Sequence, residues 1–202
     1  MRTGQRISSG YTAPAPSAPR PERRLSNPVQ RTCVTFAETA EETRGHRTVV
    51  VVEMEPGSRD GVHCHTTFEE RFEVLDGEIV LTIGGTDRTL RRGETENVKP
   101  GVAHAVANRG GRAAQIRVDV TPGHTGYERS LRIRCGLARD GQLDEDGKPR
   151  NPFHLAVVHR LGDTCPGPAT GSIMPMVWLL GRIARAVGIE RRLIARYCVP
   201  GA

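Results

Sequence analysis

The sequence has few aromatic residues and no long apolar segment. Aromatic side chains make up 4% of its 202 residues, which argues against the row of stacking rings that single-stranded nucleic acids need. The apolar run at 173–181 is followed at once by Arg182 and Arg185, and it is too short to span a bilayer. We therefore expect no nucleic-acid partner and no membrane partner.

Cysteine pairing motifs and a targeting signal are also missing. The five cysteines are odd in number, are scattered, and form no CxxC pair: Cys33, Cys64, Cys135, Cys165 and Cys198. The N-terminus lacks the apolar core of a secretory signal. The sequence therefore predicts free thiols, a reducing compartment and a cytoplasmic location.

The net charge of +6 is concentrated at the two ends of the chain. Residues 1–31 hold six arginines against one acid, and residues 181–202 hold five arginines against one acid. The middle of the chain is therefore acidic overall. Because the basic charge belongs to the ends, solvated termini explain it better than a nucleic-acid-binding surface does.

Composition divides the chain into three parts. Residues 1–31 are rich in Pro, Ser, Ala and Arg, which predicts a disordered basic tail. Residues 32–121 hold short β-branched runs separated by glycine turns, which predicts an all-β barrel or sandwich. The Asp76–Gly77 step within this part indicates a hairpin between two short strands. Residues 122–202 read as a helical extension.

Three helices are expected in this extension. One covers about 127–138, and a second follows Asn151 and Pro152, which have the pattern of an N-cap and a first-turn proline. A third covers about 175–187 and ends at Gly188. We expect these C-terminal helices to pack on the barrel; a dimer contact or a lid is the alternative.

The segment from Gly57 to Gly77 carries the first candidate ligands. Residues i and i+2 of a strand share a face, so His63 and His65 present two imidazoles side by side while Cys64 faces away. After a short turn, Glu70 on a neighbouring strand faces the same interior. Two pocket residues, Phe72 and Val74, follow it inward, whereas Glu69 has the opposite parity.

A second segment, from Gly93 to Asn108, supplies one more imidazole. The Pro100–Gly101 step makes a turn, and His104 on the following strand points into the same cavity, with Val106 as a further pocket residue. Asn108 is expected to fix a turn. Three imidazoles and one carboxylate suit a divalent first-row metal ion.

These two segments resemble the two motifs of the cupin superfamily. The first motif is Gly, five residues, His-x-His, four residues, Glu, six residues, Gly, as found from Gly57 to Gly77. The second matches at Gly93, Gly101, His104 and Asn108, and departs at Lys99, where the family usually has proline. The later GLARDG and NPFHLAVVHRL stretches look like those of small bacterial single-domain cupins likened to quercetin dioxygenases.

The resemblance implies a jelly-roll β-barrel that holds an ion on His63, His65, Glu70 and His104. It favours Fe²⁺ or Mn²⁺, with Zn²⁺ or Ni²⁺ as alternatives. The competing interpretation is a barrel that has lost its ion, but this would bury a carboxylate without a cation, which is costly. The remaining histidines lack partners at ligand spacing and are expected to be structural or exposed: His46, His124, His154 and His159.

Three functions are compatible with this ligand set. The first is an oxidoreductase, a dioxygenase acting on a small aromatic or enolic substrate. The second is a non-redox isomerase, cyclase or lyase, which would need a base that the sequence does not show in the pocket. The third is a small-molecule-binding module without turnover. Exposed sheet edges predict a homodimer.

Overall fold

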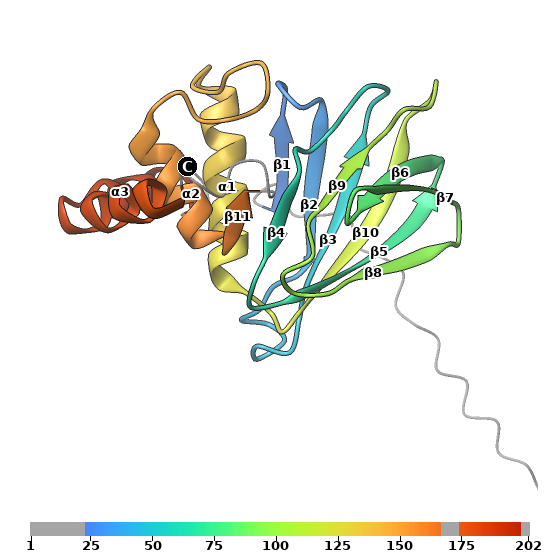
Figure 1. Cartoon of the computed structure of the whole chain (residues 1–202), viewed down its shortest axis with the longest axis horizontal. Helices are drawn as coiled ribbons and strands as arrows, with labels where there is room; N and C mark the ends of the chain where they lie inside the picture. Colours follow the sequence, from blue (N-terminus) through green and yellow to red (C-terminus); the bar gives the residue numbers. More distant parts are fainter. Residues whose placement is uncertain (1–22, 167–173, 199–202) are drawn as a thin grey trace, which may run out of the picture.

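The computed structural model describes residues 23–166 and 174–198 (Figure 1). The strands in these ranges are β1 (Arg24–Asn27), β2 (Thr32–Glu38), β3 (Thr48–Met54), β4 (His63–His65), β5 (Glu69–Asp76), β6 (Glu78–Ile83), β7 (Thr86–Arg91), β8 (Thr95–Val98), β9 (His104–Ala107), β10 (Ala114–Thr121) and β11 (Thr164–Pro166). The helices are α1 (Thr125–Arg139), α2 (Pro152–Leu161), α3 (Met174–Ala186) and α4 (Ile189–Tyr197).

The strands form two antiparallel sheets. One has the order β1-β2-β3-β10-β5-β8 and the other the order β11-β4-β9-β6-β7. Strands β5 and β10 alternate buried with partly exposed residues, as expected where one sheet face is covered. The two sheets and their antiparallel pairing confirm the predicted all-β jelly roll with helices beside it (Figure 1).

The interior between the sheets is mainly apolar. Phe36, Phe72 and Leu81 are at most 4% exposed and belong to one continuous cluster. Burying a side chain of this size contributes about 1.5–3 kcal/mol of folding free energy. This core fixes the positions of the strands that carry the candidate ligands.

The hairpin expected at Asp76–Gly77 is wrong. Strand β5 pairs with β10 and β8, whereas β6 pairs with β7 and β9, so the chain crosses from one sheet to the other at Gly77. Gly77 has φ +77°, and a Cβ there would lie 2.9 Å from the carbonyl oxygen of Ala113. Glycine is therefore needed at a corner between sheets, and the same dipeptide signal does not separate a corner from a hairpin.

The expected disordered tail is wrong for its last residues. Residues 24–27 form β1, whose residue Leu25 pairs with Val34 of β2 and is buried. Residues 1–22, the rest of that prediction, lie outside the described residues. A single buried leucine among arginines and serines is too weak a pattern to predict an edge strand.

The three helices expected after β10 are confirmed as α1, α2 and α3. The side chain of Asn151 accepts hydrogen bonds from the backbone N–H groups of Phe153 and His154, so it caps α2 as predicted, with Pro152 in the first turn. Gly188, with φ +78°, separates α3 from α4, a short helix that the sequence did not predict. No helix among the described residues has both the length and the apolar character that a membrane crossing requires.

The helices gather on one side of the sheets (Figure 1). From α1, Leu131 and Cys135 join the core of the β domain, while Ile133 and Leu137 face the other helices in a second apolar cluster. Helix α1 therefore lies between the β domain and the rest of the extension. This position lets α1 reach the interior where the candidate ligands lie.

Candidate metal centre

Three strands bring the four predicted ligands together. Strand β4 carries His63 and His65, and His63 pairs with His104 on the adjacent strand β9. Glu70 lies on β5 in the opposite sheet, so the expectation that it sits on a strand neighbouring the histidines is wrong. It faces the three imidazoles across the interior. The chain reverses direction between the sheets at residues 66–68, and this crossing places the carboxylate opposite the rings.

The four side chains converge on one point. One potential ligand atom from each lies within 4.8 Å of the other three. Glu70 Oε2 is 2.8 Å from His104 Nε2 and 3.6 Å from His65 Nε2. His65, Glu70 and His104 are buried, and His63 is half-buried. The arrangement therefore has the size of one coordination sphere and opens on the side of His63.

Backbone carbonyls fix the orientation of all three rings. Each Nδ1 lies 2.7–3.1 Å from a carbonyl oxygen: His63 from Gly61, His65 from Gly162, and His104 from Val102. A carbonyl only accepts hydrogen bonds, so Nδ1 carries the proton and Nε2 keeps its lone pair. Metal-binding histidines are oriented in this way by a hydrogen bond from their other nitrogen.

The donor atoms fit a divalent cation. His65 Nε2, Glu70 Oε2 and His104 Nε2 are buried and have no hydrogen-bond partner among the described residues. Two lone pairs facing each other at 2.8 Å repel unless a proton or a cation lies between them, and an unpaired buried carboxylate is costly. Imidazole nitrogens with one carboxylate oxygen are ligands that first-row divalent metals accept. A metal ion would satisfy all three atoms at once.

The pKa values of the candidate ligands are shifted by burial and by the charges that the ligands exert on one another. Burial lowers the pKa of His65 to about 4, against the attraction of Glu70. Burial would raise the pKa of Glu70, but a hydrogen bond from His104 when that ring is protonated, together with the nearby imidazoles, lowers it overall. Burial also lowers the pKa of His104, yet the hydrogen bond that the protonated ring makes to Glu70, and the charge of Glu70, outweigh it and raise the pKa. Glu70 is therefore ionised above its lowered pKa, and its negative charge attracts either a proton on His104 or a cation.

A cavity of about 200 Å³ leads to the four ligands. Of the predicted pocket residues, Phe72 and Val106 line it, whereas Val74 is buried in the core outside this lining. Further apolar side chains from β3, β10 and α1 complete its walls: Val50, Val52, Met54, Ile116, Val118 and Leu131. The cavity thus combines a largely apolar wall with a polar end formed by the four candidate ligands, as small-molecule sites commonly do.

Sequence reasoning missed four polar residues of this cavity: Asp60, Tyr127, Arg134 and His159. Arg134 donates to both oxygens of Asp60 at 3.2 and 3.3 Å. Tyr127 lies close enough to Glu70 that burial, followed by this negative charge, raises its pKa well above the ordinary value. Tyr127 and Arg134 are seven residues apart on α1, and this two-turn spacing is the one sequence signal that could have paired them.

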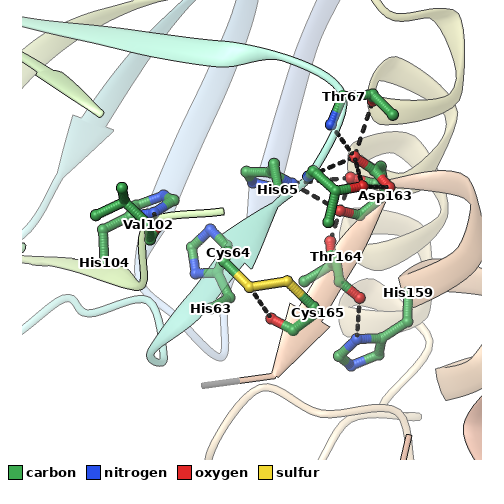
Figure 2. The surroundings of a disulfide bond; sticks show 12 residues. His63, Cys64, His65, Thr67, Val102, His104, His159, Asp163, Thr164 and Cys165 are labelled. Atoms are coloured by element: carbon green, nitrogen blue, oxygen red, sulfur yellow. Dashed lines mark hydrogen bonds between the residues drawn. A yellow bond between two sulfur atoms is a disulfide. The ribbon is translucent and has the colours of Figure 1, made fainter. Parts of the chain in front are cut away.

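The expectation that all cysteines are free is wrong for two of them. Cys64 and Cys165 form a disulfide, while Cys33, Cys135 and Cys198 are free. Cys64 does face away from the ligands, as its position between two inward histidines predicts (Figure 2). The two cysteines are 101 residues apart in sequence, so only the packing of the extension against β4 brings them together.

Other predicted roles are found where expected. Asn108 donates to the carbonyls of Met54 and Arg112 and accepts from Gly110, so it fixes a turn. Glu69 faces outward and pairs with Lys99. His124 accepts from the backbone N–H of Tyr127 and caps α1. His159 is the exception among these predictions, because it was expected to be structural or exposed and instead lines the cavity.

Comparison with known proteins gives one family. Residues 50–121 match the family model of the cupin domain. No curated protein sequence matches the chain. Among solved structures it is similar to a predicted oxalate decarboxylase from Thermotoga maritima, with 22% identity over 45% of this chain and 80% of that chain and a TM-score of 0.44.

Two further structures show similar levels of likeness. An RmlC-like cupin from Shewanella frigidimarina has 17% identity over 48% of this chain and 80% of that one, with a TM-score of 0.42. The polyketide cyclase RemF from Streptomyces resistomycificus has 18% identity over 45% of this chain and 64% of that one, with a TM-score of 0.41. Likeness at this level transfers no activity.

Proposed function

Since the chain belongs to the cupin superfamily through its domain at residues 50–121, we propose that it is a metal-dependent enzyme acting on a small organic molecule. Dioxygenation of an aromatic or enolic substrate is the reaction that we favour. The observation that carries the proposal is the group of three buried, partnerless atoms of His65, Glu70 and His104 at the floor of an apolar cavity.

Four protein donors leave room on a five- or six-coordinate ion for further ligands. We propose Fe²⁺ or Mn²⁺, with Zn²⁺ or Ni²⁺ as alternatives. When bound, the ion supplies Lewis acidity and, if it is iron or manganese, one-electron chemistry with oxygen.

The chain's own residues contribute binding and protonation. Phe72, Val106 and the other apolar walls remove water from a bound molecule and orient it. Tyr127, whose pKa is raised by burial and by Glu70, keeps its proton and can donate a hydrogen bond into the cavity. An oxygen atom of the substrate is the natural acceptor for this donor.

Oxygen uptake tests the proposal. Metal-free protein is loaded with Fe²⁺ without oxygen and is then mixed with flavonols and related enols in an oxygen electrode. We expect uptake with at least one substrate, and none with a Glu70→Gln variant. A Glu69→Gln variant, altered only at the outward carboxylate, serves as the control. No uptake by fully iron-loaded protein across the panel would contradict dioxygenation.

One observation favours a second, non-redox function. Isomerases and lyases need a group that moves protons, and the structure places Asp60 and His159 in the cavity lining where the sequence showed none. Zn²⁺-loaded protein that exchanges substrate hydrogen for deuterium from the solvent without oxygen would favour this function. Binding of a small molecule without either reaction would indicate a non-catalytic module.

The quaternary structure and location remain predictions. Strands β1, β8, β11 and β7 end the two sheets, and α3 exposes Met176, Trp178 and Leu179 at 57–62%, so we propose a homodimer, to be tested by analytical ultracentrifugation. A cytoplasmic location is also proposed, although free thiols no longer support it because Cys64 and Cys165 are bonded.

A further inference from the structure

The residues that follow α2 reach one of the candidate ligands from behind. We call residues 162–165 the clasp. His65 Nδ1 lies 3.0 Å from the carbonyl oxygen of Gly162 and 3.3 Å from that of Asp163. The acceptors for His63 and His104 are each only two residues away in sequence. His65 alone takes its orientation from a segment about a hundred residues away, outside the region that matches the cupin domain.

Asp163 holds the clasp on the β domain. Its carboxylate accepts hydrogen bonds from the backbone N–H groups of Thr66 and Thr67, both at 2.7 Å, and from both hydroxyl groups (Figure 2). These are the two residues that follow His65. One side chain therefore fixes the turn after the ligand while its own backbone carbonyl faces the ligand ring.

The backbone of Asp163 is consistent with this function. Its φ of +48° is in the left-handed region, which a non-glycine residue adopts at some cost. Such a conformation persists when surrounding contacts fix it. Here the conformation directs the carboxylate and the carbonyl of one residue to the same strand.

Two further connections secure the clasp. Strand β11 pairs with β4, with Thr164 opposite His65 and Cys165 opposite Cys64. The disulfide joins the second of these pairs on the face of β4 away from the candidate ligands (Figure 2). The strand that carries two candidate ligands is thus held by hydrogen bonds and by a covalent bond from the C-terminal extension.

We propose that the clasp belongs to the metal centre, with Asp163 as a positioning residue that keeps the Gly162 carbonyl against His65. The inference rests on the proposed metal site. Loss of an outer hydrogen-bond partner of a ligand typically costs roughly 10–100-fold in metal affinity. Metal affinity should therefore depend on Asp163 and, more weakly, on the Cys64–Cys165 bond.

Reduction of the disulfide is the natural way to loosen the clasp. A small dithiol would be oxidised to its cyclic disulfide, while Cys64 and Cys165 would each gain one hydrogen and become thiols. The hydrogen bonds of Asp163 would remain. The effect of reduction should therefore be smaller than the effect of removing the carboxylate.

Mn²⁺ affinity measured by the electron paramagnetic resonance of the free ion tests the proposal. Mn²⁺ prefers oxygen and imidazole ligands to thiols, so a dithiol disturbs it little. We expect Asp163→Ala to weaken binding by roughly 10–100-fold. Asp163→Asn should recover part of the loss, because its amide oxygen still accepts from the two N–H groups.

Asp87→Asn is the matched control. Asp87 also accepts from a threonine hydroxyl, that of Thr82, and pairs with Arg109, but it lies on β7 away from the ligands. Its replacement should leave Mn²⁺ affinity unchanged. A general loss of stability would affect both variants, whereas a positioning role affects only Asp163.

The contribution of the Cys64–Cys165 bond is also tested by Mn²⁺ affinity, in protein that keeps Asp163. Wild-type protein should lose affinity when a dithiol is added, and Cys165→Ala should show that lower affinity with or without the dithiol. In metal-free protein, ¹⁵N nuclear magnetic resonance of His65 should show the Nδ1–H tautomer in the wild type and a mixture in Asp163→Ala.

Two results would overturn the inference, and they differ. Folded Asp163→Ala and reduced wild type that both bind Mn²⁺ as tightly as untreated wild type would refute the clasp alone. Wild-type protein that binds neither Mn²⁺ nor Fe²⁺, Zn²⁺ or Ni²⁺ in a calorimetric titration would refute the proposed metal site and the clasp with it.

Discussion

The β domain and the C-terminal extension contribute different things to one site. The β domain supplies all four candidate ligands from β4, β5 and β9. The extension supplies none of them, but it provides Tyr127, Arg134 and His159 to the cavity and the carbonyl acceptor for His65. A ligand set can therefore be encoded within one compact domain while its orientation and its pocket depend on a second region.

The largest effect on metal affinity is expected from changing a candidate ligand itself. Glu70→Gln removes the anionic donor and should weaken metal binding by more than the roughly 10–100-fold that an outer contact costs. Calorimetric titration of metal-free protein measures it. Glu69→Gln should bind as the wild type does, because Glu69 faces outward toward Lys99. The reverse order of the two variants would contradict the assignment of Glu70.

A smaller effect is expected where the extension supports the ligands. In Gly162→Ala, the new Cβ would lie 2.8 Å from Ser130 Oγ and 2.9 Å from Thr164 Oγ1. Overpacking of this kind costs about 1–3 kcal/mol, and the shift should also move the carbonyl away from His65. Both the metal affinity and the free energy of unfolding, measured with urea, should decrease.

Gly111→Ala is the control for that substitution, since a Cβ there meets nothing within 4 Å. Unchanged metal affinity in Gly162→Ala would show that the β domain alone orients His65. The contribution claimed for the extension would then be wrong.

The contact between the two regions should depend on pH. Burial would raise the pKa of Asp60, but Arg134 on α1 outweighs this and holds it well below the ordinary 3.8. A lowered pKa means that the ion pair stabilises the fold above about pH 4 and is lost as the pH falls through the folded value. Both side chains are 26% exposed, so Asp60→Asn should cost about 1–3 kcal/mol at pH 7.

Urea unfolding of the wild type and of Asp60→Asn at pH 7 and pH 3 measures this difference. The gap between the two proteins should narrow at pH 3. An equal gap at both values would mean that the ion pair does not couple α1 to the loop before His63.

The smallest effect should stay within the extension. Asn151→Ala removes the cap of α2, in which Oδ1 accepts from Phe153 N at 2.8 Å, and should cost about 1 kcal/mol. Thermal unfolding measures the loss. Metal affinity should not change, because the clasp has its own connections to β4. A parallel fall in metal affinity would show that the two regions are not separable in this way.

His63, His65 and Glu70 were predictable because their spacing is local, whereas His104 was assigned from the separate segment that resembles the second cupin motif. Strand alternation alone places His63 and His65 on one face, and parity separates Glu70 from Glu69. The cap at Asn151 was equally predictable, because capping depends on adjacent residues. Such signals lie within a few residues of one another, so the sequence displays them directly.

The contacts between the two regions were not predictable. Cys64 and Cys165 are 101 residues apart, and β11 is too short to give a strand pattern. Arg134 and Asp60 could not be paired, because nothing in either segment indicates that α1 lies over the loop before His63. The Asp76–Gly77 step shows the same limit, since it gives a turn but not the sheet that the chain enters next.

X-ray absorption spectroscopy of protein loaded with one equivalent of Fe²⁺ in the absence of oxygen tests the central claim most directly. The account predicts one ion per chain with three imidazole ligands and a carboxylate, and two imidazoles in His104→Ala. An ion bound by fewer than three imidazoles in the wild type, or by a thiolate, would contradict it.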